Sequence, residues 1–391
     1  MNRDLAASSA AGPDAVPDRA PTPDPVAGTD GASTPLSAAP RRIAVVGGGI
    51  IGLAIAAELS GRGADVVVYE SAPDGTGGAW HVAAGMLAPG GESAFEYPHL
   101  TRLLEAGQEL WPSFAAGLGD VGYDRTGTLS LALTADDVAE AAREWKHQKL
   151  TPLTGSQVRD LEAAISPRVR AGAFAAAEHQ VDPRKVVAVL RDRLAGRIIT
   201  REITDLSELD ADGGSGTGAS AGRPDVIIVA AGHRTGALTG LPIRPVKGQV
   251  LRLRGEPGLL EHVIDGAADG RHVYLVPRAD GEVVVGATQE ERADRMPTAA
   301  GVHDLLRAAL DLVPGLAEHE LAEVTVGHRP GTPDNAPILG YLDDDRRVVV
   351  AAGHFRNGIL LAPITARLIA DLVLTGSADP ILDAFGPGRF R

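Results

Sequence analysis

The chain has 391 residues, of which 44% are hydrophobic and 4% aromatic, and its formal net charge at pH 7 is −14. This length favours two or three domains with a core of mainly aliphatic side chains, and the negative charge argues against nucleic acid or an anionic membrane as a partner. The absence of cysteine excludes disulfides, thiolate metal sites, cysteine nucleophiles and a flavin attached through sulfur.

The first 40 residues are rich in Ala, Pro, Asp, Ser and Gly and contain almost no large apolar side chains. Such a segment buries too little surface to offset its ordering entropy, so we expect residues 1–40 to form a disordered tail.

Arg41 and Arg42 then precede an apolar stretch and imitate a twin-arginine export signal, but the glycine spacing and Glu58 favour a strand, a turn and a helix. No apolar run is long enough to span a membrane. We therefore expect a cytoplasmic protein, and we expect no metal site.

The next part of the chain alternates strand and helix signals. Two β-branched runs, RRIAVVG (41–47) and ADVVVYE (64–70), enclose a helical pattern, and PDVIIVAAG (224–232) is a further buried strand that ends in glycine. Residues 243–288 alternate strongly between apolar and polar side chains, which predicts a meander of antiparallel strands. The sequence 210–225 is expected to be a surface loop between two strands. Helices are predicted at 51–62, 98–117, 135–149, 156–161, 184–195, 301–312 and 360–375. The chain therefore combines a parallel α/β part with an inserted antiparallel part.

A dinucleotide-binding pattern follows the first predicted strand. Gly47, Gly49 and Gly52 have the spacing G-x-G-x-x-G and open the first predicted helix, and Glu70 ends the next strand. These glycines allow a tight turn, a close approach of the backbone to a pyrophosphate and close helix packing, and the acid would bind ribose hydroxyls. The helix N-terminus adds free N–H groups for the phosphates. The acidic residue argues against NADP, whereas NAD and FAD both remain open at this point.

Four further stretches carry a resemblance to a known family. They are AAGMLAP (83–89), VKGQ with YLVPR and VGAT (246–288), GHRPGTPDNAPILG (327–340) and AAGHFRNGILLAP (351–363). Together with the glycine pattern they resemble the glycine oxidases of thiamine biosynthesis, within the D-amino-acid-oxidase-like flavoproteins, over about residues 41–388. The resemblance implies a mixed α/β (α+β) fold in which a Rossmann-like FAD-binding domain is interleaved with an antiparallel-sheet substrate domain. The implied ranges are 41–120, 178–246 and 326–388 for FAD, and 121–177 and 247–325 for substrate.

The same resemblance implies the substrate-binding residues. The carboxylate-binding arginine would be Arg329, the substrate-contacting tyrosine Tyr274 and the second active-site arginine Arg356, while Gln289 and Met86 would line the substrate pocket. An arginine fork matches a carboxylate in a way that lysine cannot. The alternatives are structural roles: an interface ion pair for Arg329, core packing for Tyr274, and an ion pair with a nearby acid for Arg356.

The implied FAD contacts extend over several segments. The loop 353–358 would pass the flavin edge, and a helix beginning near Gly358 would aim its N–H groups at the pyrimidine end of the ring, where reduction places negative charge. The predicted contacts are Gly47, Gly49, Ile50, Ile51, Gly52, Glu70, Ala83, Ala84, Gly85, Met86, Ile203, Gly232, Gly353, Arg356, Asn357, Gly358 and Ile359.

The resemblance implies that FAD takes a hydride from the α-carbon of glycine, with oxygen as the final acceptor, and yields hydrogen peroxide and an imine for thiazole synthesis. If the amine arrives neutral, no side chain need act as a carbon base, so His328 and His354 are expected to support the backbone.

Trp80-His81 is similar to the pair that holds flavin covalently in dimethylglycine and sarcosine dehydrogenases, but its spacing to Gly85 is one residue longer, and we expect non-covalent FAD. The alternatives are a broader sarcosine, secondary-amine or D-amino-acid oxidase, a non-catalytic flavin-binding protein and, from the glycine pattern alone, an NAD-dependent dehydrogenase. The expected partners are a small amino acid and oxygen, and the sequence leaves homo-oligomerisation open.

Overall fold

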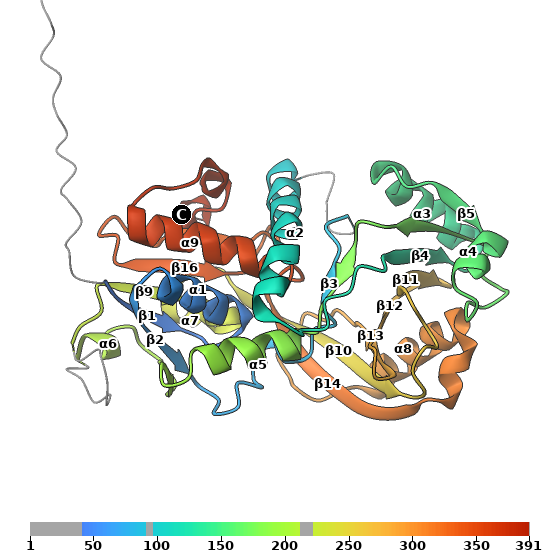
Figure 1. Ribbon diagram of the computed structural model, residues 1–391, viewed down its shortest axis with the longest axis horizontal. Helices are drawn as coiled ribbons and strands as arrows, with labels where there is room; N and C mark the ends of the chain where they lie inside the picture. The colour runs from blue at the N-terminus through green and yellow to red at the C-terminus, as the bar shows by residue number, and fades with distance from the viewer. Residues whose placement is uncertain (1–40, 91–96, 212–221, 391) are drawn as a thin grey trace, which may run out of the picture. The chain divides into compact units, whose positions relative to one another are not determined.

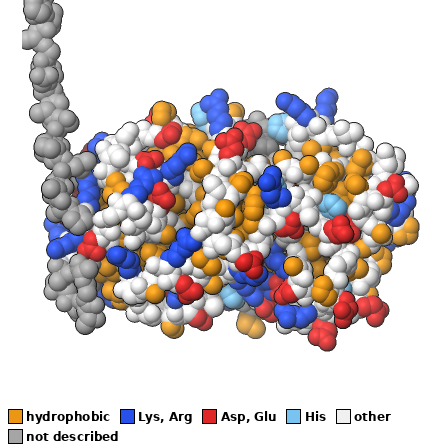
Figure 2. All heavy atoms as spheres, in the orientation of Figure 1, with side chains coloured by type: hydrophobic (Ala, Val, Ile, Leu, Met, Phe, Trp, Pro, Cys, Tyr) orange, Lys and Arg blue, Asp and Glu red, His pale blue; other side chains and the backbone are white. Residues whose placement is uncertain are grey.

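The computed structural model describes residues 41–90, 97–211 and 222–390. They form a six-stranded sheet, an eight-stranded sheet and a two-stranded ribbon (Figure 1). The predicted disordered tail and residues 212–221 of the predicted loop lie outside the described residues. On the face of the described residues shown in Figure 2, acidic and basic side chains are interspersed.

The six-stranded sheet has the order β15-β16-β9-β1-β2-β8. All neighbouring strands are parallel except β15 and β16, which are antiparallel. Val45, Val66 and Val68 are fully buried, as expected of strands covered on both faces of a parallel sheet. The strands are β1 (Arg42–Val46), β2 (Asp65–Glu70), β8 (Ile198–Thr200), β9 (Val226–Val229), β15 (Ile338–Tyr341) and β16 (Val348–Ala352).

Four long helices pack on one face of this sheet. They are α1 (Ile50–Gly61), α2 (Pro98–Leu118), α5 (Pro183–Arg193) and α9 (Ala362–Thr375), and their apolar faces share one core with Ile43 and Val45 of β1. The opposite face of β1 packs against Ile203 and Leu209. Two short helices, α6 (Glu208–Ala211) and α7 (Thr235–Thr239), were not predicted.

The eight-stranded sheet has the order β14-β10-β13-β12-β11-β4-β6-β5. The expected simple meander over 243–288 was wrong in its pairing: β11, β12 and β13 form the meander, whereas β10 pairs with β13 and β14. One pair, β4 with β11, is parallel. The strands are β4 (Thr128–Ala132), β5 (Pro152–Thr154), β6 (Ala171–Ala175), β10 (Arg244–Arg254), β11 (Val263–Ala268), β12 (Arg271–Pro277), β13 (Glu282–Gly286) and β14 (Glu320–Gly331).

The two faces of the eight-stranded sheet pack against different parts of the chain. One face packs against α8 (Ala299–Leu312) in an aliphatic core. On the other face, Val250 and Val276 pack with Val82 and Ala84, so the second face meets the segment that leads into the ribbon of β3 (Met86–Leu87) and β7 (His179–Gln180). The remaining elements are α3 (Ala135–His147), α4 (Gly155–Leu161) and the 3₁₀ helices η1 (Ala79–His81), η2 (Gly232–Arg234), η3 (Pro314–Glu318), η4 (Pro380–Ala384) and η5 (Pro387–Phe390).

The seven predicted helices are confirmed, each with both ends within two residues of the prediction. None of the helices in the described part of the chain is long and apolar enough to cross a membrane. Strands of the six-stranded sheet fall within the ranges predicted for the FAD domain. β10 and β14 each cross a predicted boundary, at 246–247 and 325–326. The division into two domains stays a prediction.

Candidate active site

The three glycines of the dinucleotide pattern have different surroundings. Gly47 has φ +112°, and a side chain there would overlap the carbonyl group of Ala230, while a side chain at Gly52 would overlap the carbonyl oxygen of Gly47. At Gly49 the nearest atom to an added Cβ, apart from chain neighbours, is Cδ1 of Trp80, 3.8 Å away. The protein itself therefore requires glycine at the first and third positions and leaves open space at the second. A dinucleotide pyrophosphate that approaches the backbone fits this space.

The N-terminus of α1 faces the same space. Gly49 caps this helix without a side-chain hydrogen bond, so no side chain competes for the first N–H groups at Ile50 and Ile51. Glu70, at the end of β2, accepts hydrogen bonds from the backbone N–H groups of Gly48 (2.7 Å) and Ala72 (2.9 Å). These bonds fix its carboxylate at the edge of the cavity with lone pairs left for ribose hydroxyls.

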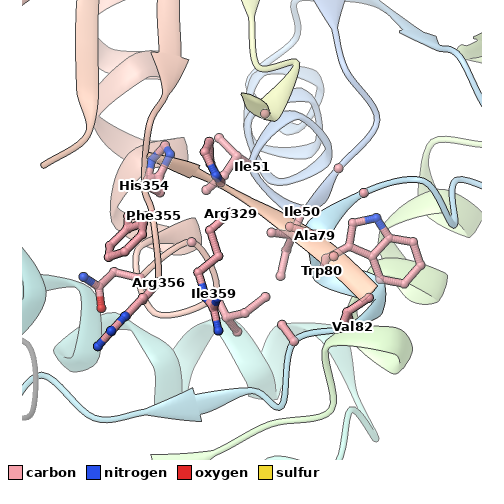
Figure 3. A pocket seen from close by; sticks show the side chains of 18 of the residues that line it. Ile50, Ile51, Ala79, Trp80, Val82, Arg329, His354, Phe355, Arg356 and Ile359 are labelled. Atoms are coloured by element: carbon pink, nitrogen blue, oxygen red, sulfur yellow. The ribbon is translucent and has the colours of Figure 1, made fainter. Parts of the chain in front are cut away.

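A cavity of about 880 Å³ extends from this loop to the eight-stranded sheet, a size at the upper end of the range for ligand pockets. Most of the predicted site residues line it, and Figure 3 shows several of them, with Phe355 and Arg356 opposite Trp80 and Val82. The predicted residues on its wall are Gly47, Gly49, Ile50, Ile51, Glu70, Ala83, Ala84, Gly85, Met86, Ile203, Gly232, Tyr274, Gln289, Arg329, Arg356, Asn357, Gly358 and Ile359.

Gly52 and Gly353 do not line the cavity. Gly52 lies beneath the loop, where it allows α1 to pack closely on Gly47. Gly353 has φ +77°, and an added Cβ would lie 2.6 Å from Cγ2 of Thr332. Both glycines therefore shape the backbone around the site, and neither one lies on the wall that a ligand would contact.

Two glycines let large polar side chains lie flat on the sheet. Added Cβ atoms at Gly248 of β10 and Gly286 of β13 would collide with the guanidinium of Arg329 and the hydroxyl of Tyr274, respectively. Arg329 donates a hydrogen bond to the carbonyl oxygen of Thr288 at 3.0 Å. Burial raises the pKa of Tyr274, and the positive charges of the nearby arginines oppose this shift, so the tyrosine is a neutral donor at physiological pH.

The second arginine comes from the loop after β16. Arg356 donates a hydrogen bond to the side-chain oxygen of Gln289, and its guanidinium lies 5.4 Å from the ring centre of Phe355. Gln289 follows Thr288, so two consecutive residues after β13 hold the two predicted arginines. This arrangement places two cations and a phenol hydroxyl at one end of the cavity, where they can bind a carboxylate.

The loop before α9 is anchored by a buried histidine. Nε2 of His354 lies 3.1 Å from Oγ1 of Thr365 on α9, and burial lowers the pKa of His354 to about 3, so it is neutral. The expected helix start near Gly358 was wrong: α9 begins at Ala362, after a hydrogen-bonded turn in which the Leu361 N–H binds the Asn357 carbonyl. A proline at the second position of α9 suits a helix start, and this explains the later onset.

Two arginines that the sequence analysis missed hold the segment between the sheets. Arg184 of α5 donates to the carbonyl oxygen of His81 at 2.9 Å and makes a two-bond ion pair with Glu323, at 2.9 and 2.8 Å. Arg278, directly after β12, donates to the carbonyl oxygen of Ala84 and to Oε1 of Gln180 at 2.6 Å. Arg278 belongs to the quoted stretch YLVPR, so a signal was present, whereas nothing local marks Arg184.

Two further histidines, His233 and His328, line the cavity, whereas His81 does not. Nε2 of His328 lies 3.1 Å from the carbonyl oxygen of Asp294. Burial, together with electrostatic repulsion from His328, lowers the pKa of His233 to about 4. His81 is not on the cavity wall: it lies in a separate hollow beside Arg184, and burial lowers its pKa. Its position offers no support for a covalent flavin link.

The comparisons with known proteins agree with this geometry. Residues 42–372 match the protein family described as DAO, FAD dependent oxidoreductase. The chain is 36% identical over 366 residues to the bifunctional protein ThiO/ThiG of Synechocystis sp., covering 89% of this chain and 54% of that protein. It therefore spans about half the length of this curated relative and of two similar ones.

Shorter relatives match over nearly their whole length. The glycine oxidase of Geobacillus kaustophilus is 33% identical, with 85% of this chain and 92% of that protein covered. A crystal structure of the glycine oxidase from the same organism superposes with a TM-score of 0.78 at 29% identity, covering 88% of this chain and 98% of that one. The family match covers most of the chain, and the glycine loop and cavity suit a dinucleotide. The chain thus belongs to the family of FAD-dependent oxidoreductases.

Proposed function

We propose that this protein is an FAD-dependent oxidase that oxidatively deaminates glycine. The observation that carries the proposal is the joint placement of Arg329, Tyr274 and Arg356 at the sheet end of a cavity whose other end has the dinucleotide loop. A small amino acid brings one carboxylate, and paired arginines suit it. The likeness to proteins named glycine oxidase supports the same substrate.

The proposed roles follow from the geometry of each residue. FAD held by the glycine loop at Gly47 and Gly49 would supply the acceptor for a hydride from the substrate α-carbon, with oxygen as the final electron acceptor. Arg329 binds the substrate carboxylate from a position fixed by the carbonyl oxygen of Thr288, and Arg356 adds a second positive charge held by Gln289. The hydroxyl of neutral Tyr274 orients the substrate between them. His354 is buried and neutral and supports the loop.

FAD is held without a covalent bond by the predicted contacts from Gly47 to Ile359, in a dinucleotide domain separate from the substrate domain. Met86 and Gln289 limit the substrate pocket. The product imine serves thiazole synthesis, a role that the name ThiO/ThiG of the longer relatives favours. The enzyme works in the cytoplasm with oxygen as acceptor.

A broader secondary-amine or D-amino-acid oxidase is the second candidate, because Gln289 brings a polar amide to the wall of the proposed substrate pocket. Peroxide formation with glycine, sarcosine and D-alanine decides between the two. We expect the largest kcat/KM for glycine. A kcat/KM for sarcosine or D-alanine more than tenfold above that for glycine would assign the broader activity instead.

A further inference from the structure

The cavity does not end at the proposed glycine site. It continues along the face of the eight-stranded sheet, where Tyr274 of β12 pairs with Asp265 of β11 and Asp265 pairs with Ser130 of β4. Thr128 lies on the same face of β4, two residues earlier. Since neighbouring strands lie about 4.8 Å apart, the wall from Tyr274 to β4 extends about 10 Å beyond the carboxylate-binding end.

This extension carries acidic side chains. Glu178, Asp265 and Glu144 line it together with His272. Asp265 and His272 form an ion pair at 2.7 Å, and the aspartate raises the pKa of His272 to about 9, so the pair has no net charge near neutral pH. Glu144 accepts a hydrogen bond from Gln148 at 3.1 Å.

Glu178 is a buried carboxyl group at this wall. The residue is 9% exposed, it has no ion pair with the other described residues, and burial raises its pKa to about 8. The hydroxyl of Thr128, which is 2% exposed, lies close enough to lower that pKa slightly. However, it has no well-directed hydrogen bond to a residue in the described part of the chain. Buried polar groups in this state lack the partners that water or a ligand would supply.

We propose that this extension is a substrate subsite that binds a positively charged amino group, so that the enzyme also takes amino acids carrying a second ammonium beyond the reacting amine. This inference rests on the proposed function, because the substrate carboxylate must be held at Arg329. An ammonium beside Glu178 would favour the ionised form of its carboxyl group, so Glu178 supplies the negative charge once the cation is bound, and Thr128 supplies an acceptor for one of the ammonium N–H groups.

The length of the wall suits a short aliphatic spacer. A substrate held by its carboxylate at Arg329 reaches β4 with a chain of four or five atoms, as in lysine or in an N-aminoalkyl glycine. His272 and Arg356 lie nearer the carboxylate-binding end and carry positive charge, so a cation is favoured only when it extends past them. A substrate with a short cationic group therefore gains nothing from the subsite.

The test compares pairs of substrates that differ in one charge. Peroxide formation is measured for lysine and 2-aminoheptanoic acid, each as both enantiomers, and for N-(3-aminopropyl)glycine and N-butylglycine. We expect at least one cationic member to exceed its neutral partner tenfold or more in kcat/KM. Glu178→Gln should bring that ratio close to one, while Glu140→Gln, an exposed carboxyl one turn away from Glu144 on α3, should keep it. A loss of activity that affects all substrates of a variant equally cancels in the ratio of the two kcat/KM values.

A wild-type ratio below threefold for every pair would overturn the inference, and so would a ratio that persists in Glu178→Gln. Glycine turnover decides the proposed function separately, because glycine does not reach the subsite. If no amine is oxidised, the proposed function fails. The same pairs of compounds are then titrated against the oxidised flavoprotein, and binding is followed by the flavin absorbance. The ratio of the Kd of the neutral compound to that of the cationic compound then tests the subsite, with the same tenfold and threefold thresholds.

Discussion

Gly49 and Gly52 lie three residues apart, yet an added side chain would meet very different surroundings at the two positions. At Gly52 it would overlap the Gly47 carbonyl, whereas at Gly49 it would enter the cavity beside Trp80. The G-x-G-x-x-G spacing predicts that glycine is needed at each position. The spacing does not tell which glycine serves packing and which one serves the ligand, because the answer depends on where Gly47 and Trp80 lie in the folded chain.

Replacing Gly49 with valine should therefore abolish FAD retention and leave the apoprotein folded. The added methyl groups would occupy the space of the pyrophosphate without touching the backbone. Flavin absorbance after gel filtration and the far-UV circular dichroism spectrum measure the two effects. Gly52→Val is the matched control, and it should lose the fold itself. A Gly49→Val protein that purifies with a full complement of FAD would contradict the assignment of the loop.

Arg329 is the residue on which substrate recognition depends in this account. Charge-assisted hydrogen bonds contribute about 1.5–3 kcal/mol each. Arg329→Ala should then lower kcat/KM for glycine by an amount that corresponds to about 3–5 kcal/mol of lost transition-state stabilisation. Arg329→Lys keeps the charge but not the planar two-donor geometry, so it should recover only part of the loss. FAD content should stay unchanged. Wild-type kcat/KM in a folded, yellow Arg329→Ala protein would show that the arginine only holds the Thr288 carbonyl.

At the scale of elements, the segment from His81 to Ala84 is fixed by side chains from both halves of the chain. Arg184 of α5 holds the first carbonyl and Arg278 after β12 holds the last. The helix bounds could be predicted from the sequence because helical periodicity is local. The pairing of β10 with β13, and these two arginine contacts, could not be predicted because they join residues far apart in the chain.

Arg278→Met should destabilise the fold by about 2–4 kcal/mol, because the Ala84 carbonyl and the Gln180 amide oxygen would both lose a buried donor. Urea unfolding followed by flavin release measures the change. Arg271→Met, at the start of β12, where the arginine side chain is 37% exposed, is the control, and it should cost less than about 1 kcal/mol. Equal stability of the two variants would show that Arg278 does not fasten this segment.

His354 joins the loop after β16 to α9, and its burial predicts how stability depends on pH. The pKa falls from 6.5 to about 3 in the folded protein, so the unfolded chain binds a proton below pH 6.5 that the folded state does not. The free energy of unfolding should therefore be highest above pH 6.5 and decline as the pH falls toward 3, by up to about 1.4 kcal/mol per unit from this group. Urea unfolding at pH 7.5 and 5 should show a steeper decline for the wild type than for His354→Gln. Equal slopes would mean that His354 is protonated in the fold.

At the scale of the whole molecule, the cavity is assembled from segments spread between Val46 and Leu360. The motif residues Arg329, Tyr274 and Arg356 could be predicted because each belongs to a recognisable stretch. Asp265 could not, because only the register of β4, β11 and β12 brings it to this sheet face. Glu178 could not, because it lies between β6 and β7 and reaches the cavity only in the folded chain. The carboxyl groups of this part of the cavity come from residues far apart in the chain, so only the folded structure shows that they lie together.

The central claim, that glycine is the substrate of the bound flavin, is tested most directly by an anaerobic titration of the purified protein with glycine. Two-electron reduction bleaches the visible absorbance of FAD, and readmitted oxygen restores it as peroxide forms. We expect full bleaching by glycine, at a rate that falls sharply in Arg329→Ala. A yellow protein that dithionite bleaches and glycine leaves unchanged would show that glycine is not the substrate.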